Sequence, residues 1–167
     1  MQIVPYDRER ALAYARRWAF SRNPKYFNFD GIGGDCTNFA SQCLFAGSGV
    51  MNDTPVFGWF YRSSEDRTAS WTGVEYFYNF IVGNAVGIGD GFGPYAEEVK
   101  LEDLRVGDFV QLGRETGDFY HTPVVVGFSR NGIPLVAAHS YDAFLRPLTS
   151  YSFAKLRCLH IVAVRKK

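Results

Sequence analysis

Residues 31–49 read GIGGDCTNFASQCLFAGSG, and this stretch predicts a glycine-rich turn that leads into an amphipathic helix. Asp35 takes the N-cap position, while Gly47 and Gly49 supply the stop signals at the other end. The apolar residues recur at the spacing of one helical face: Cys36, Phe39, Ala40, Cys43 and Leu44. The polar residues fill the opposite side: Thr37, Asn38, Ser41 and Gln42. We therefore expect a helix from Asp35 whose apolar face packs on the later part of the chain.

The remainder of the chain divides into a helical first part and a strand-rich last part. Apolar spacing predicts a helix from Asp7 to about Ser21 and a short one over 74–82. Valine-rich and phenylalanine-rich runs separated by turns predict four strands, over 108–112, 120–128, 133–140 and 158–165. This order predicts an α+β fold in which N-terminal helices pack on a C-terminal antiparallel sheet. No linker interrupts residues 1–167, so we expect one domain.

Composition excludes several classes of function. The 18 basic and 17 acidic residues nearly cancel, and no basic run occurs before the terminal RKK, so we do not expect nucleic-acid binding. No apolar run approaches the roughly 18 residues that a membrane span requires. The first residues lack the pattern of a signal peptide. We therefore expect a protein that stays inside the cell or is exported by a signal outside this chain, which leaves its compartment open.

The three cysteines do not predict a disulfide framework, because their number is odd and Cys36 and Cys43 lie two helical turns apart. The spacings of paired cysteines or histidines that hold structural zinc are also missing. We expect no metal and no cofactor.

Cys36 is the candidate nucleophile because it occupies the first turn of the predicted helix. Unpaired backbone N–H groups and the positive end of the helix dipole favour an anion there, which would help to ionise the thiol. The same N–H groups could bind the oxyanion that forms after attack on a carbonyl. The alternative is a buried, unreactive thiol, and Cys43, two turns deeper, fits that description.

His121 is the candidate general base because it opens the hydrophobic run HTPVVVGF, where a side chain can emerge at the edge of a sheet. A half-exposed structural histidine is the alternative interpretation. A base needs a third group that fixes its orientation. If residues 130–132 form a three-residue loop, His139 lies on the same face as His121 and diagonally adjacent to it. If the loop contains only two residues, Asp142 lies opposite His121, and a bulge would change the choice again.

Several stretches resemble the putative amidase domain family over nearly the whole chain. They are YARRWAFSRNPKYFNFDGIGGDCTNFASQCLFAGSGVMN, GWFYR, SWTGVEYFYNF, VGDFVQL, HTPVVV and AHSYDAFLRPLTSY. The order of Cys36, His121 and a later polar residue is similar to that of papain-like cysteine hydrolases in their compact NlpC and CHAP forms. The resemblance implies a papain-like fold and hydrolysis of an amide bond by Cys36, His121 and a third residue, with His139 preferred to Asp142. Bacterial cell-wall peptides are the substrates of wider relatives, so a peptidoglycan stem peptide is the suggested partner.

These expectations combine into one mechanism with two rivals. We expect Cys36 to attack an amide carbonyl, His121 to carry the proton to the leaving amine, and water to release the acyl-enzyme. Asn38 and Gln42 are weaker candidates for the oxyanion site, and Asp35 is expected to cap the helix. Trp59 and Trp71 are expected either to line a substrate groove or to pack in the core. The rivals are transfer of the acyl group to an amine and a non-catalytic module that binds a peptide or glycan.

Overall fold

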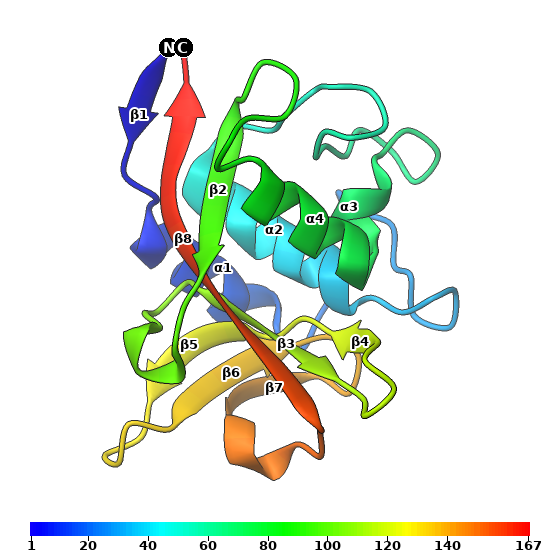
Figure 1. Ribbon diagram of the computed structural model, residues 1–167. Helices are drawn as coiled ribbons and strands as arrows, with labels where there is room; N and C mark the ends of the chain where they lie inside the picture. The colour runs from blue at the N-terminus through cyan, green and yellow to red at the C-terminus, as the bar shows by residue number, and fades with distance from the viewer.

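The computed structural model describes all residues, 1–167, as a mixed α+β fold with an antiparallel sheet and few helices (Figure 1). The helices are α1 (Arg8–Trp18), α2 (Cys36–Ser48), α3 (Ala69–Thr72) and α4 (Val74–Gly83). The strands are β1 (Gln2–Val4), β2 (Gly93–Glu98), β3 (Phe109–Gly113), β4 (Phe119–His121), β5 (Val124–Phe128), β6 (Pro134–Ala138), β7 (Ala143–Pro147) and β8 (Lys155–Lys166). Two short 3₁₀ turns, Leu101–Asp103 and Leu148–Ser150, complete the elements.

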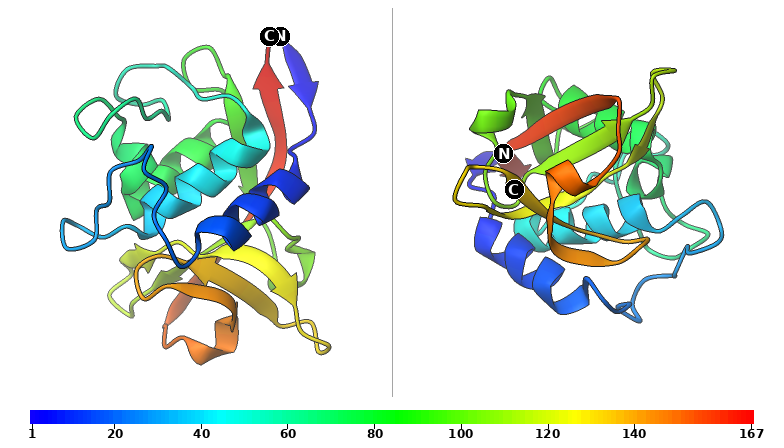
Figure 2. Two further views of the ribbon diagram at one scale, coloured as in Figure 1. Left: turned by 180° about the vertical axis from the view of Figure 1, so that it is seen from behind. Right: turned by 90° about the horizontal axis from the view of Figure 1, so that it is seen from below.

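The long strand β8 organises the sheet. The main path of paired strands is β1-β8-β3-β5-β6-β7, with β2 also paired to β8 and β4 paired to β3, and every pairing is antiparallel. Gln2 of β1 pairs with Lys166 of β8, so the two ends of the chain lie side by side (Figures 1 and 2). The C-terminal half of β8 holds β1 and β2, while its N-terminal half holds β3.

Helix α2 lies at the centre of the molecule and is buried on nearly all sides. Ten of its residues are buried, including all four polar residues expected opposite the apolar face. Its polar groups find partners on other elements: Trp59 Nε1 donates to Ser41 Oγ at 3.1 Å, and the Tyr14 hydroxyl donates to Gln42 Oε1. The polar side of the helix is therefore as buried as its apolar side. Burial of these groups is tolerated because each is hydrogen-bonded.

The predicted elements agree with the structure in type but differ at their ends. Helix α1 begins after Asp7, whose carboxylate accepts the N–H of Arg10 at 3.0 Å, and α2 ends at Gly49 in the left-handed region. The run expected as one strand over 120–128 is divided into β4 and β5 around Thr122 and Pro123. Strands β1, β2 and β7 and helix α3 were not predicted. No helix in the structure has the length and apolar character needed to span a bilayer.

Candidate active site

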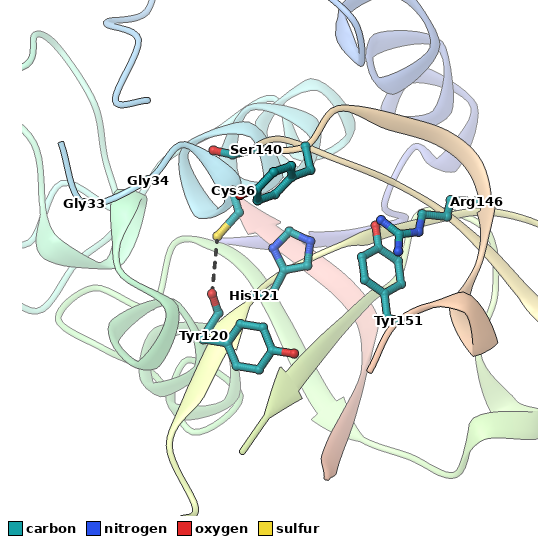
Figure 3. Close-up of a pocket in the computed structure, with 9 residues that line it drawn as sticks. Gly33, Gly34, Cys36, Tyr120, His121, Ser140, Arg146 and Tyr151 are labelled. Atoms are coloured by element: carbon teal, nitrogen blue, oxygen red, sulfur yellow. Dashed lines mark hydrogen bonds between the residues drawn. The ribbon is translucent and has the colours of Figure 1, made fainter. Parts of the chain in front are cut away.

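A cavity of about 540 Å³ opens where the start of α2 meets β4 and the segment from β6 to Tyr151 (Figure 3). Its walls bring together parts of the chain that are more than a hundred residues apart in sequence. They are formed by Gly33, Gly34, Cys36, Tyr120, His121, Ser140, Tyr141, Arg146 and Tyr151. Cys36 and His121 thus line the same cavity, whereas His139, Asp142 and the two candidate tryptophans do not.

Cys36 is the first residue of α2 and is partly exposed, while Cys43 is completely buried. The thiol of Cys36 faces β4, with its Sγ 3.9 Å from the carbonyl oxygen of Tyr120 (Figure 3). The chain reaches this position through Gly33 and Gly34, whose φ angles of 83° and 98° favour glycine. The two cysteines of the helix therefore differ as expected in exposure, and only Cys36 reaches the cavity.

Asp35 precedes the helix but its carboxylate does not cap it. Oδ1 accepts hydrogen bonds from the N–H of Phe29 and from Asn38 Nδ2, both at 2.9 Å, and Oδ2 lies 2.6 Å from Nδ1 of His139. The expectation that Asp35 caps α2 through its side chain is wrong, because both carboxylate oxygens are engaged by these other partners. The backbone N–H of Cys36 has no acceptor within the chain and remains available to an anion.

His121 ends the short strand β4, where Leu112 of β3 pairs with it. Figure 3 shows its ring between the Cys36 thiol on one side and the side chains of Arg146 and Tyr151 on the other. Neither ring nitrogen forms a hydrogen bond within the chain. Both nitrogens are therefore free to exchange a proton with a thiol or a bound molecule.

A buried hydrogen bond links the two neighbours of the candidate pair. Thr37 follows Cys36, Thr122 follows His121, and their hydroxyl oxygens lie 3.1 Å apart. Gln111 of β3 donates from Nε2 to Thr122 Oγ1 at 3.3 Å and to the Val74 carbonyl at 2.9 Å. This connection fixes the start of α2 against the end of β4, and so sets the position of the thiol relative to the imidazole.

Electrostatics at the site favour a neutral pair in the free protein. Burial raises the pKa of the Cys36 thiol, although hydrogen bonds from Thr37 and from the N–H of Thr122 act in the opposite direction. Burial also lowers the pKa of His121 to about 4, and the positive charge of Arg146 adds to this effect. The donors at the start of α2 favour the thiolate as expected, but burial outweighs them, so the pKa of the thiol is raised. A neutral imidazole at pH 7 can accept the thiol proton as attack begins.

The residue expected to orient His121 does not lie beside it in the structure. The three-residue loop over 130–132 is confirmed, because Ser129 N–H donates to the Ile133 carbonyl at 2.9 Å and Gly132 has a φ of 80°. A bulge at Val126 then shifts the pairing, so that Val125 lies opposite Val136. The extra residue lies in β5 and shifts its register against β6 by one position, so His139 is no longer on the strand face expected for a neighbour of His121.

His139 instead lies in the core, with only 1% of its surface exposed. Its ring stacks on Phe39 with centroids 4.0 Å apart, and its Nε2 lies 2.8 Å from the carbonyl oxygen of Trp18. Asp142 binds Arg22 through both carboxylate oxygens, at 2.9 and 3.0 Å. The assignments of His139 and of Asp142 as the group that orients His121 are therefore corrected.

Four further candidates support the core and not the cavity. Asn38 donates to the Phe27 carbonyl and accepts from Trp71 Nε1, so its amide has no free group for an oxyanion. Gln42 is bound to Tyr14, as described above. Trp59 and Trp71 are completely buried and stack on each other at 4.7 Å. Their alternative role in core packing is the one that the structure has.

Sequence reasoning did not identify five of the residues that line the cavity: Tyr120, Ser140, Tyr141, Arg146 and Tyr151. Tyr120 could have been found as the neighbour of His121. Ser140 is the last residue of the strand expected over 133–140, and Tyr141, Arg146 and Tyr151 lie in or beside β7, which was not predicted.

The comparisons with known proteins identify one family and one relative. The family described as "Putative amidase domain" matches residues 5–162. A protein of Bacillus subtilis (strain 168) described as "Uncharacterized protein YhbB" is 36% identical over 143 residues, which cover 84% of this chain. The match spans only 43% of the length of that relative. No solved structure matches the chain.

Proposed function

Because the chain belongs to the putative amidase domain family, we propose that it hydrolyses an amide bond through a covalent intermediate on Cys36. The family supports amide hydrolysis in general. The cysteine mechanism rests on one observation above the others: Cys36, at the first position of α2, shares a cavity with His121, whose ring nitrogens are unpaired.

In the first half-reaction, Sγ of Cys36 attacks the substrate carbonyl carbon while its proton passes to His121. The free N–H of Cys36, at the start of α2, donates a hydrogen bond to the developing oxyanion. Collapse of the tetrahedral intermediate breaks the C–N bond, and His121 returns the proton to the leaving amine. A thioester between the acyl group and Cys36 remains.

In the second half-reaction, His121 accepts a proton from water, and the resulting hydroxide attacks the thioester carbonyl. The C–S bond breaks, a carboxylic acid leaves, and the proton returns to the sulfur of Cys36. Thr37 and Thr122 act as positioning residues, because their hydrogen bond holds the elements that carry the thiol and the imidazole.

We also propose a structural class and a substrate for this site. The order of a cysteine at a helix start and a histidine on a later antiparallel strand supports a papain-like arrangement of the NlpC and CHAP type within one unit over residues 1–167. A cell-wall stem peptide is the proposed substrate. Exposed Gly33 and half-buried Gly34 support a peptide, because a substrate backbone can approach the thiol there without meeting a side chain.

The direct experiment incubates the wild-type chain with muropeptides and a library of synthetic peptides and reads the products by mass spectrometry. We expect cleavage that is lost in Cys36→Ala and retained in Cys43→Ala, a matched control that removes a thiol from the core of the same helix. Thermal melting of each variant checks that it is folded. Equal cleavage by Cys36→Ala, or no cleavage by the wild type, would overturn the proposal; cleavage that spares all muropeptides would overturn the cell-wall substrate.

A further inference from the structure

Arg146 is the one side chain with a full positive charge in the wall of the cavity, and no carboxylate lines that wall. Its guanidinium forms no ion pair within the chain. Figure 3 shows it at the side of the cavity opposite Cys36, beyond the ring of His121. The cation therefore faces the space that a substrate bound to Cys36 would occupy.

The guanidinium is held in a fixed orientation. Nε donates to Ser150 Oγ at 2.8 Å and Nη2 donates to the Ser150 carbonyl at 3.2 Å, while the planar group lies 3.6 Å above the centre of the Tyr151 ring. These contacts leave Nη1 without a partner in the chain. A donor that is already positioned loses little conformational freedom when it binds an acceptor, which raises the affinity for that acceptor.

The acidic residues near the cavity do not neutralise Arg146. Asp30 and Asp142 both bind Arg22, at 2.7 and 2.9 Å. Asp35 is paired with His139 below the cavity. The open N–H of Cys36 and the unpaired face of Arg146 therefore give the cavity a positive character at two points.

A second unpaired donor lies at the same side. The hydroxyl of Tyr151 is buried and has no hydrogen-bond partner in the chain. Figure 3 shows this hydroxyl next to the Arg146 guanidinium. A buried polar group without a partner is destabilising, so its presence here fits a site that is completed by a ligand.

We propose that Arg146 binds a carboxylate of the substrate, so that this chain selects amides that carry a free carboxylate near the bond to be cleaved. The inference rests on the proposed function and specifies its substrate class. Arg is suited to this role because its planar group can present two N–H donors to one carboxylate.

The test uses two matched pools of synthetic peptides. One pool contains Asp, Glu and free C-terminal carboxylates, and the other replaces them with Asn, Gln and C-terminal amides. Cleavage is measured at pH 8, where His121 is neutral with or without Arg146. We expect Arg146→Gln to lower kcat/KM for the acidic pool by about 10- to 100-fold, the range expected for a hydrogen bond to a charged group. For the neutral pool, kcat/KM should change by less than about 3-fold.

Two further variants test whether the effect depends on the charge and on the position of Arg146. Arg146→Lys restores the charge without the planar fork and should recover part of the lost activity. Arg130→Gln removes the same charge from an exposed turn between β5 and β6 and should leave both pools unchanged. Equal losses for the two pools in Arg146→Gln, or no preference of the wild type for the acidic pool, would overturn the inference while leaving the proposed function intact.

A binding measurement separates this inference from the proposed function. Cys36→Ala is incubated with both pools, and the peptides retained on ultrafiltration are identified by mass spectrometry. We expect enrichment of the acidic pool, and loss of that enrichment in the Cys36→Ala, Arg146→Gln double variant. Enrichment without any cleavage by the wild type would contradict the amidase proposal but support Arg146 as a carboxylate site; absence of enrichment would contradict the site.

Discussion

The hydroxyl oxygens of Thr37 and Thr122 lie 3.1 Å apart in the interior, and each threonine directly follows one member of the proposed catalytic pair. Helix α2 and strand β4 are separated by 70 residues of sequence, so this contact depends on the completed fold. It ties the peptide units that carry Cys36 and His121 to one point. Small displacements of either side chain are costly for catalysis, because the reacting groups must be aligned.

Thr37→Val should therefore lower kcat more than it changes KM. Valine keeps the shape of threonine but removes the hydroxyl, which leaves the Thr122 hydroxyl with one partner fewer. We expect kcat to fall on the order of 10-fold and the free energy of unfolding to fall by about 1–3 kcal/mol. Steady-state kinetics and urea unfolding measure the two effects.

The double variant Thr37→Val, Thr122→Val supplies the control for that prediction. If the two hydroxyls act through each other, the loss in the double variant is smaller than the sum of the single losses. Strict additivity, or a change in KM alone, would show that the contact does not position the pair.

The pH dependence of activity tests the role of His121. Its pKa is about 4, below the ordinary value, because burial and the charge of Arg146 disfavour the protonated ring. Protonation abolishes the base, so kcat/KM should fall on the acid side near pH 4 and stay high from there through pH 6.5. In Arg146→Gln the nearby cation is gone, and the acid limb should move to higher pH. A limb near pH 6.5 in the wild type, or one that does not move in the variant, would exclude this assignment.

Asp35 and His139 should contribute to stability and not to proton transfer. Both are buried, and their Oδ2 and Nδ1 atoms lie 2.6 Å apart. Asp35→Ala or His139→Ala leaves a buried polar group without its partner, and we expect a loss of about 3–5 kcal/mol in urea unfolding. Asp142→Ala breaks a partly exposed pair with Arg22 and should cost about 1 kcal/mol or less.

The pH profile of activity distinguishes a structural role of His139 from the role in orienting His121 that was expected from the sequence. A folded His139 variant should keep the acid limb of the wild type, because His139 does not contact His121. A shifted limb in a variant of unchanged stability would restore His139 as the group that orients the base.

Local signals predicted the parts of the fold that depend on neighbouring residues. Asp7 and Gly49 mark the ends of their helices because caps act within one turn, and the change from helical to alternating spacing indicated the sheet. Strand β7 was missed because it contains Leu145 with a φ of 59°, an uncommon value that no sequence pattern announces. Because β7 was not predicted, Arg146 was not identified as a residue of the site.

The candidate site was also predicted only where local signals mark it. Cys36 and His121 were found because each stands at the end of a recognisable element. The third residue was not, since the bulge at Val126 shifts the register between β5 and β6 by one residue. The choice of Asp35 between capping its helix and binding His139 also depends on a contact across 104 residues. Sequence periodicity contains no information about such long-range competition.

The covalent intermediate on Cys36 is the central claim, and mass spectrometry of the acid-quenched reaction tests it most directly. The wild-type chain is mixed with the acidic peptide pool, stopped within the first turnovers and digested, and the fragment that contains Cys36 is examined for an acyl adduct. We expect a thioester on Cys36 that hydroxylamine removes and that Cys36→Ala does not form. Continued turnover with no adduct on Cys36, or an adduct on Cys43 or Cys158 instead, would contradict it.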